Sequence, residues 1–174
     1  MSALETEKRR DVLLALLRER SEPVTGTDLA QRFAVSRQVI VQDIAILRAA
    51  GEQVLATPQG YLIPQAEKKS AVRTVVACRH TREQIADEIG IVVDNGGKVL
   101  DVIVEHPVYG EMRGNLMIAN RRDLAIFLEQ LGKTEANPLS ALTGGVHLHT
   151  LEASDNQVLQ EIVASLSEAG FLVD

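Results

Sequence analysis

The chain has little of several residue types on which whole classes of structure depend. It contains one cysteine, no tryptophan, three phenylalanines and two tyrosines in 174 residues. The single Cys78 excludes a disulfide framework and a four-cysteine zinc site, and it fits a reducing, cytoplasmic setting. No apolar run approaches the ~18 residues of a transmembrane helix, and the charged first 20 residues lack the apolar stretch of a signal peptide. Aliphatic side chains must therefore fill the core.

Charge is distributed unevenly along the chain. Residues 1–63 hold eight of the 18 Lys and Arg residues and eight of the 24 Asp and Glu residues, so this part is neutral. Residues 64–174 hold the remaining ten against sixteen and carry the whole net charge of -6. Such a balance does not favour nucleic-acid binding in general, but the neutral part can still present a local basic face.

Residues 1–64 have the pattern of a winged helix-turn-helix domain. Their periodicity predicts helices over 4–20, 28–34 and 37–51, followed by two short strands around the turn at 58–60. The apolar stripe expected on the first helix consists of Val12, Leu13, Leu16 and Leu17. Thr25 and Asp28 have the spacing of a capping box, and Ser36 is a suitable N-cap for the third helix. Three helices and a hairpin in about sixty residues are typical of this fold.

The third helix carries the candidate DNA contacts. Ile40, Ile44 and Leu47 form the stripe that packs inward, which leaves the N-terminal part of the opposite face exposed. Recognition helices read the major groove mainly through such residues, where Arg pairs with guanine, Gln with adenine and Val with a thymine methyl. The expected DNA-binding residues are Ser36, Arg37, Gln38, Val41 and Gln42, with Gln59 in the wing. The alternative is a helical bundle with an ordinary polar face, which does not explain the wing.

The pattern of residues 71–174 predicts an α+β domain, which follows a polar joint at 64–70. Strands are expected over 71–78, 98–105, 112–119 and 145–153, and helices over 81–96, 120–132 and 154–170. Thr81 and Gln84 form a capping box for the first of these helices, and Ser154 is the expected cap of the last. The order β-α-β-β-α-β-α describes a sandwich with helices on one face of a mainly antiparallel sheet. It is also the order of the phosphocarrier protein fold, but topology alone does not give function.

Four residues of this domain are candidate metal ligands. His147 and His149 alternate along a strand and so leave the same face, either toward solvent or toward a site. Glu88 lies inside the apolar arc of its helix, where a carboxylate is costly unless it is paired or bound to a metal. His80 ends the first strand, which can lie beside the last. Three imidazoles and a carboxylate suit a divalent transition metal such as nickel or zinc. The alternative is that His80 caps a loop, Glu88 forms a salt bridge and the strand histidines face water.

The loop "HPVYG" and its surroundings form a second candidate site. His106 precedes a proline in a tight connection, where a histidine often only bonds backbone groups. Tyr109 and Arg113 follow closely, so the three residues could instead line a pocket for a small anionic effector.

With these motifs assembled, the chain resembles the niacin-responsive transcriptional repressors of bacteria. The resemblance covers essentially the whole chain, through "VSRQVIVQDIAILRAAG", "EHPVYG" and "LTGGVHLHTLEA", without a departure from the pattern. It implies a homodimer that binds double-stranded operator DNA of NAD-biosynthesis or niacin-uptake genes, with nicotinic acid as co-repressor. It also implies one divalent metal per chain on the positions that match, His80, Glu88, His147 and His149.

Three other functions are compatible with the same residues. The same ligands could belong to a metal-dependent hydrolase fused to a winged helix, although the sequence offers little else for acid–base work and no phosphate-binding loop or serine nucleophile elbow. The chain could be a winged-helix regulator that senses a different small anion. A phosphocarrier-like regulator would need an exposed, metal-free histidine at a helix N-terminus, and His80 is placed for that. A metal assay separates these possibilities.

Overall fold

The structure is a computed structural model that describes residues 3–64, 71–134 and 136–173. The chain divides into two compact units, Met1–Glu67 and Lys68–Asp174. Most of the joint expected at 64–70 lies outside the described residues. Among the described residues, no helix has the length and apolarity needed to span a membrane.

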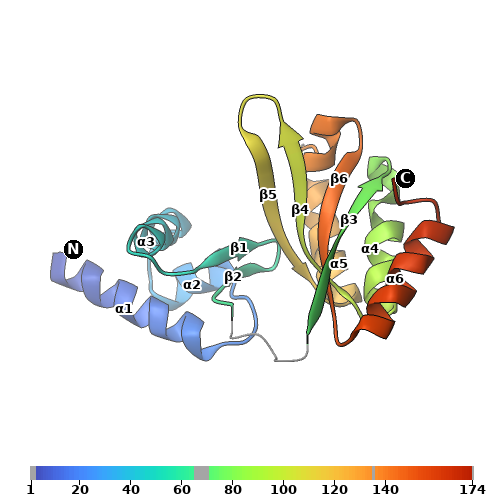
Figure 1. Ribbon diagram of the computed structural model, residues 1–174. Coiled ribbons are helices and arrows are strands. Elements are labelled where there is room, and N and C mark those ends of the chain that lie inside the picture. Colours follow the sequence, from blue (N-terminus) through green and yellow to red (C-terminus); the bar gives the residue numbers. More distant parts are fainter. Residues whose placement is uncertain (1–2, 65–70, 135, 174) are drawn as a thin grey trace. The chain divides into compact units, whose positions relative to one another are not determined.

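The first unit is a helix-turn-helix with a two-stranded wing (Figure 1). Its elements are α1 (Ala3–Glu19), α2 (Gly26–Arg32), α3 (Arg37–Ala49), β1 (Leu55–Thr57) and β2 (Gly60–Leu62). Both predicted caps are present, because Thr25 accepts a hydrogen bond from the backbone of Asp28 and Ser36 accepts one from that of Val39. Strands β1 and β2 pair antiparallel, and Tyr61 also pairs with Val24. The predicted α+β class, with this domain first, is confirmed.

The core of the first unit is aliphatic, as the composition requires. Its buried residues are Leu13, Leu16, Leu17, Leu29, Ala30, Ile40, Ile44, Leu47 and Val54. The prediction that Val12 belongs to this core was wrong, because its side chain is 55% exposed. Leu13, Leu16 and Leu17 already define the inward direction of α1, and one step of about 100° back along the helix turns residue 12 toward solvent.

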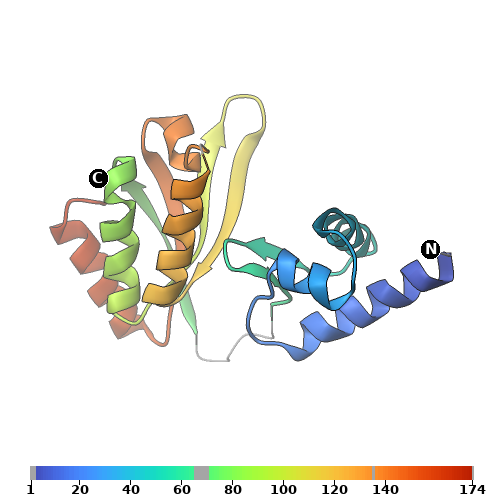
Figure 2. The ribbon, with the colours of Figure 1, turned by 180° about the vertical axis from the view of Figure 1, so that it is seen from behind.

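The second unit is a four-stranded antiparallel sheet covered on one face by three helices (Figure 2). Its strands are β3 (Val72–Arg79), β4 (Lys98–His106), β5 (Gly110–Ile118) and β6 (Val146–Ala153). Its helices are α4 (Ile85–Asp94), α5 (Arg121–Lys133) and α6 (Asn156–Glu168), with short 3-10 turns η1 (Arg82–Gln84) and η2 (Leu139–Thr143). The strand order β3-β6-β4-β5 confirms that the first and last strands are neighbours.

Two local details of the second unit differ from the prediction. Helix α6 is capped by Asp155 and not by Ser154, because extended Asp155 accepts hydrogen bonds from the backbone of Gln157 and Val158. Ser154 instead donates its hydroxyl hydrogen to Asp155. Strand β5 begins at Gly110, two residues earlier than expected, since the β4–β5 hairpin pairs as far as His106 opposite Gly110.

Candidate functional site

Strand β6 turns two histidines into the domain rather than toward solvent. His147 lies opposite Cys78 and His149 lies opposite Val76 in the β3–β6 register. Both imidazoles are buried on the face that the helices cover. The possibility that they face water is therefore wrong, and both rings occupy space that aliphatic side chains fill elsewhere in the sheet.

All four candidate ligands converge beneath helix α4. Glu88 projects from α4 and is only 1% exposed, while His80 follows β3 and is 8% exposed. The Nε2 atoms of His80, His147 and His149 lie 2.7, 3.5 and 3.3 Å from carboxylate oxygens of Glu88. Residues 67 positions apart in the chain thus share one buried point.

A backbone carbonyl orients each imidazole. The Nδ1 atoms of His80, His147 and His149 lie 2.7, 2.9 and 2.5 Å from the carbonyl oxygens of Thr81, Gly145 and Asp101. A carbonyl only accepts, so each Nδ1 donates and each Nε2 is directed inward. Metal-binding histidines are usually held in this way.

The inward-facing atoms form a donor set that fits a metal ion. His147 Nε2 and His149 Nε2 face each other across 3.1 Å. Two unprotonated ring nitrogens would repel each other at this distance, so a proton or a cation must lie between them. Among the described residues, no donor hydrogen-bonds to the buried Oε1 of Glu88. Three imidazole nitrogens and one carboxylate are also the ligand types that first-row divalent metals take.

The ionisation of the site follows from its packing. Burial alone would raise the pKa of Glu88, but the three surrounding imidazoles, of which His80 hydrogen-bonds to Oε2, outweigh it and hold that pKa well below its usual range. Burial alone would lower the pKa of His80, but the hydrogen bond and charge of Glu88 raise it. Both ring nitrogens of His80 have acceptors, so the metal-free site favours an imidazolium–carboxylate pair. Because His80 is buried and both of its ring nitrogens are in hydrogen bonds, it also lacks the exposed nitrogen that phosphorylation requires.

Cys78 is a neighbour of this site that the sequence patterns did not indicate. The sulfur of Cys78, a Glu88 oxygen and a His147 ring nitrogen all lie within 4.8 Å of one another. Burial and the nearby charge of Glu88 raise the pKa of the Cys78 thiol, which favours the protonated form rather than the metal-binding thiolate. Its position two residues before His80 was the available signal, because side chains at i and i+2 share a strand face.

A cavity of about 210 Å³ is lined by the four candidate metal ligands His80, Glu88, His147 and His149. Its other lining residues are Ile85, Ile89, Val102, Gly114, Leu116, Phe127, Leu131, Asn137, Pro138, Leu139 and Ser140. Apolar walls with a few convergent polar groups are typical of small-molecule sites.

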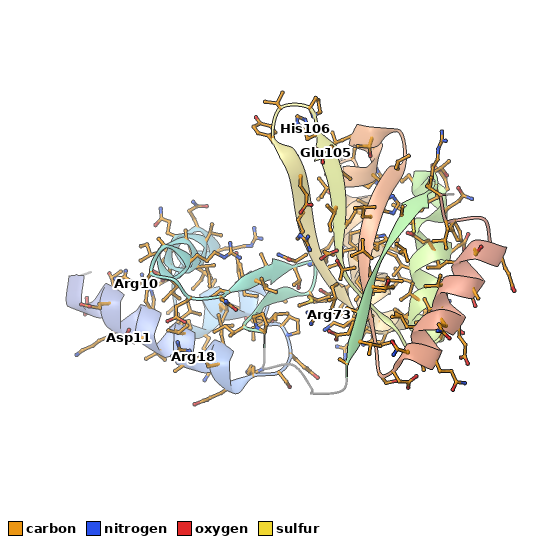
Figure 3. All side chains as sticks on the ribbon, viewed as in Figure 1. Arg10, Asp11, Arg18, Arg73, Glu105 and His106 are labelled. Carbon is orange, nitrogen blue, oxygen red and sulfur yellow. The ribbon has the colours of Figure 1, made fainter. Side chains whose placement is uncertain are left out.

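The residues expected to bind an effector do not line this cavity. His106 ends β4 at the hairpin (Figure 3), where its Nδ1 accepts the backbone N–H groups of Val108 and Tyr109. Its ring stacks on that of the exposed Tyr109, with the centroids 4.9 Å apart. Arg113 forms ion pairs with Asp101 and Glu111. The structure therefore does not bring these three residues together with the metal donors.

The candidate DNA-binding residues lie on and beside α3. Ser36 caps the helix, and Arg37, Gln38, Val41 and Gln42 are all exposed, whereas Ile40, Ile44 and Leu47 are buried as predicted. The Arg37 side chain crosses Gly26 of α2, where an added Cβ would lie 3.3 Å from its Nε. Gln59 lies in the turn between β1 and β2, but both polar atoms of its side-chain amide are buried and have no hydrogen-bond partner among the described residues, so its amide is not presented to DNA as predicted. This unit therefore combines a polar helix face with a wing.

Comparisons with known proteins agree with both units. Residues 9–62 match the HTH domain family, and residues 73–174 match the 3H domain family. The "Probable transcription repressor NiaR" of Thermotoga maritima is 44% identical over 97% of this chain and 95% of its own length. The "Transcription repressor NadR" of Bacillus subtilis is 41% identical over 95% of this chain and 93% of its own length. The chain belongs to the family of transcription repressors that join a helix-turn-helix domain to a 3H domain.

Proposed function

We propose that this repressor controls genes of NAD biosynthesis or niacin uptake and uses nicotinic acid, sensed beside a bound metal, as its co-repressor. The convergence of three inward-facing imidazoles on one buried carboxylate in the lining of a cavity is the observation that carries the proposal. A repressor that responds to a metabolite needs a ligand site as well as a DNA-binding surface, and the cavity beside these donors supports that role.

The metal site consists of His80, Glu88, His147 and His149, which hold one divalent ion, nickel or zinc. Their carbonyl-bonded Nδ1 atoms leave Nε2 free for coordination, and the carboxylate neutralises part of the ion's charge. When bound, the ion supplies a Lewis acid that can take a carboxylate or pyridine donor of the effector.

The cavity suits an aromatic effector of the size of nicotinate. An apolar cavity of about 150 Å³ is enough to bind benzene, so 210 Å³ leaves room for a ring with one carboxylate. Phe127, Leu131 and Leu139 supply apolar wall for the ring, and Asn137 supplies an amide. The proposal therefore takes its effector contacts from this cavity rather than from His106, Tyr109 and Arg113.

The operator is read by two copies of the winged helix. One such unit buries little DNA, and related regulators read two half-sites about one helical turn apart as dimers. Arg37, Gln38 and Gln42 contact base edges, Val41 contacts a thymine methyl, and Ser36 contacts the neighbouring sugar–phosphate backbone of the DNA. We place the homodimer contact in the acidic second unit.

Nicotinate and operator DNA must be coupled in both directions. A ligand shifts an equilibrium only through its different affinity for two states, so nicotinate must bind better to the DNA-binding arrangement. Operator DNA must then tighten nicotinate binding by the same factor.

Isothermal titration calorimetry of the full chain tests the proposal. Nicotinate is expected to bind the metal-loaded protein, to bind the chelator-treated protein far more weakly, and to exceed nicotinamide, which lacks the anionic carboxylate. A Leu139→Trp variant, which fills the cavity, should lose nicotinate while it keeps the metal, and His106→Ala serves as the control that keeps both. Equal affinity of nicotinate for loaded and metal-free protein would make the ion structural and refute this mechanism.

A further inference from the structure

Strand β4 departs from regular pairing next to the metal centre. Lys98 lies opposite Glu152 and Val99 opposite Leu151, but the next pair is Ile103 with Leu148. Three residues of β4 between these pairs therefore face only two residues of β6. Such a bulge breaks the regular ladder of hydrogen bonds and leaves backbone groups that need other partners.

Asp101 lies inside this bulge and accepts hydrogen bonds from both β6 residues opposite it, His149 and Thr150. Its carboxylate Oδ1 accepts the backbone N–H of Thr150 at 2.9 Å, in place of a ladder carbonyl. Its own carbonyl oxygen is thereby left for the side chain of His149, whose Nδ1 donates to it at 2.5 Å. Asp101 is itself buried, and its second oxygen accepts a hydrogen bond from Arg113.

Through Asp101, the bulge in β4 determines how the His149 side chain is oriented. The Thr150 bond holds β6 at the level where the Asp101 carbonyl meets the imidazole. The carbonyl then keeps the proton of His149 on Nδ1 and directs Nε2 toward Glu88 and His147. Without the carboxylate, the partly buried N–H of Thr150 would lose its acceptor, and such a loss favours a local shift of the strands.

We propose that Asp101 is a positioning residue of the metal centre, which acts on His149 through the β4 bulge and does not itself bind the ion. This inference rests on the proposed metal site. It assigns the role to the bond with Thr150 rather than to the ion pair with Arg113, because only the former connects β4 to the strand that carries the ligand.

Three variants of the full chain separate these contacts. Asp101→Ala removes both, Asp101→Asn keeps an oxygen that accepts from Thr150 but lacks the charge that faces Arg113, and Arg113→Gln removes the guanidinium alone. Leu159→Ala, a buried core change in α6 outside the cavity lining, is the matched control for a general loss of stability. Each protein is titrated with Co²⁺ in competition with a chromogenic chelator, and its visible absorption spectrum is recorded.

Asp101→Ala is expected to lose about 10- to 100-fold in Co²⁺ affinity, as removal of an outer partner of a ligand usually does, and to change the spectrum. Asp101→Asn, Arg113→Gln and Leu159→Ala should keep the wild-type spectrum and nearly its affinity. A wild-type spectrum and affinity for Asp101→Ala would overturn the inference, and so would a loss in Leu159→Ala as large as that in Asp101→Ala.

Nitrogen NMR of the metal-free proteins distinguishes failure of the positioning role of Asp101 from failure of the metal site itself. His149 should carry its proton on Nδ1 in the wild type and exchange between both nitrogens in Asp101→Ala. If the wild type binds no metal, the proposed function fails, and the tautomer of His149 still reports whether Asp101 orients it. An unchanged tautomer in Asp101→Ala would remove the positioning role.

Discussion

Two buried carboxylates, Asp43 in the first unit and Glu88 in the second, are compensated in different ways. Asp43 of α3 is 2% exposed and receives two hydrogen bonds from the guanidinium of Arg9, at 2.7 and 3.1 Å. Glu88 of α4 is buried as deeply, but three imidazoles surround it. Arginine stays charged at any ordinary pH, whereas an imidazole can hold a proton, lose it or bind a metal.

The difference separates a carboxylate with a permanent cationic partner from one whose partners can change their charge. Arg9 gives Asp43 a permanent cation through two hydrogen bonds, and the pair ties α1 to α3. The Glu88 cluster is complete only with a cation, which is either protons or a metal ion. Burial and a low exposed fraction are shared by both sites, so the kind of partner decides which of them responds to the environment.

The largest expected effect is loss of the metal. Replacement of both His147 and His149 by Ala leaves two of four ligands and should abolish tight binding, whereas His106→Ala should leave the metal in place. Elemental analysis of the purified full-length proteins measures this. Full occupancy in the double variant would show that the ion binds elsewhere and would remove the contrast between the two carboxylates.

Removal of the permanent cation is expected to destabilise the first unit strongly. Arg9→Ala leaves the buried Asp43 short of its principal partner, which should cost about 3–5 kcal/mol of that unit's unfolding free energy. Arg18→Ala is the control, because it breaks only the exposed pair with Glu52 and should cost about 0–1 kcal/mol. Amide hydrogen exchange in α1 and α3 reports on this unit alone. Equal effects of the two substitutions would contradict a structural role for Asp43.

The residue beside Asp43 on α3 should separate DNA recognition from stability. Gln42→Ala is expected to weaken operator binding by about 1–3 kcal/mol and to relax base preference at one position, as loss of a base contact does. Fluorescence anisotropy with operator and scrambled duplexes measures both effects. Metal content and thermal stability should not change, because Gln42 is exposed. Unchanged specificity for Ala variants of Arg37, Gln38 and Gln42 would exclude this helix from the groove.

The smallest effect concerns pH in the metal-free protein. His80 has a raised pKa, so its stabilising contribution is complete below its unfolded value of about 6.5 and is lost as pH rises through the folded value. Glu88 has a lowered pKa, so its contribution is present above about 4.3 and is lost as pH falls. The cluster should therefore stabilise the metal-free fold most between about pH 4.3 and 6.5.

Thermal unfolding of chelator-treated and metal-loaded protein across this range measures the effect. In the loaded protein the dependence should reverse above neutral pH, because protons no longer compete with the ion. His80→Gln should remove the alkaline loss from the metal-free protein. A metal-free fold whose stability keeps rising with pH would contradict the ion pair between His80 and Glu88.

Most of the fold could be predicted from local patterns. The stripe of Ile40, Ile44 and Leu47, the caps at Thr25 and Ser36, and the strand alternation around His147 all follow from interactions within a few residues. The errors are of the same local kind. Val12 lies one step from the inward direction of its helix, and Asp155 competes with Ser154 for the same cap. Each was decided by small differences in backbone geometry that spacing alone does not express.

The sequence by itself determined which groups were available to the site. These are three histidines and a glutamate that lies on the apolar, inward face of its helix. Only the tertiary structure decided their distances, because β6 pairs with both β3 and β4 and so brings His80, His149 and Asp101 together. It also added Cys78 and separated His106, Tyr109 and Arg113 from the cavity. Periodicity reports which face of an element a side chain occupies, but strand order, bulges and backbone carbonyl directions depend on the packing of distant segments.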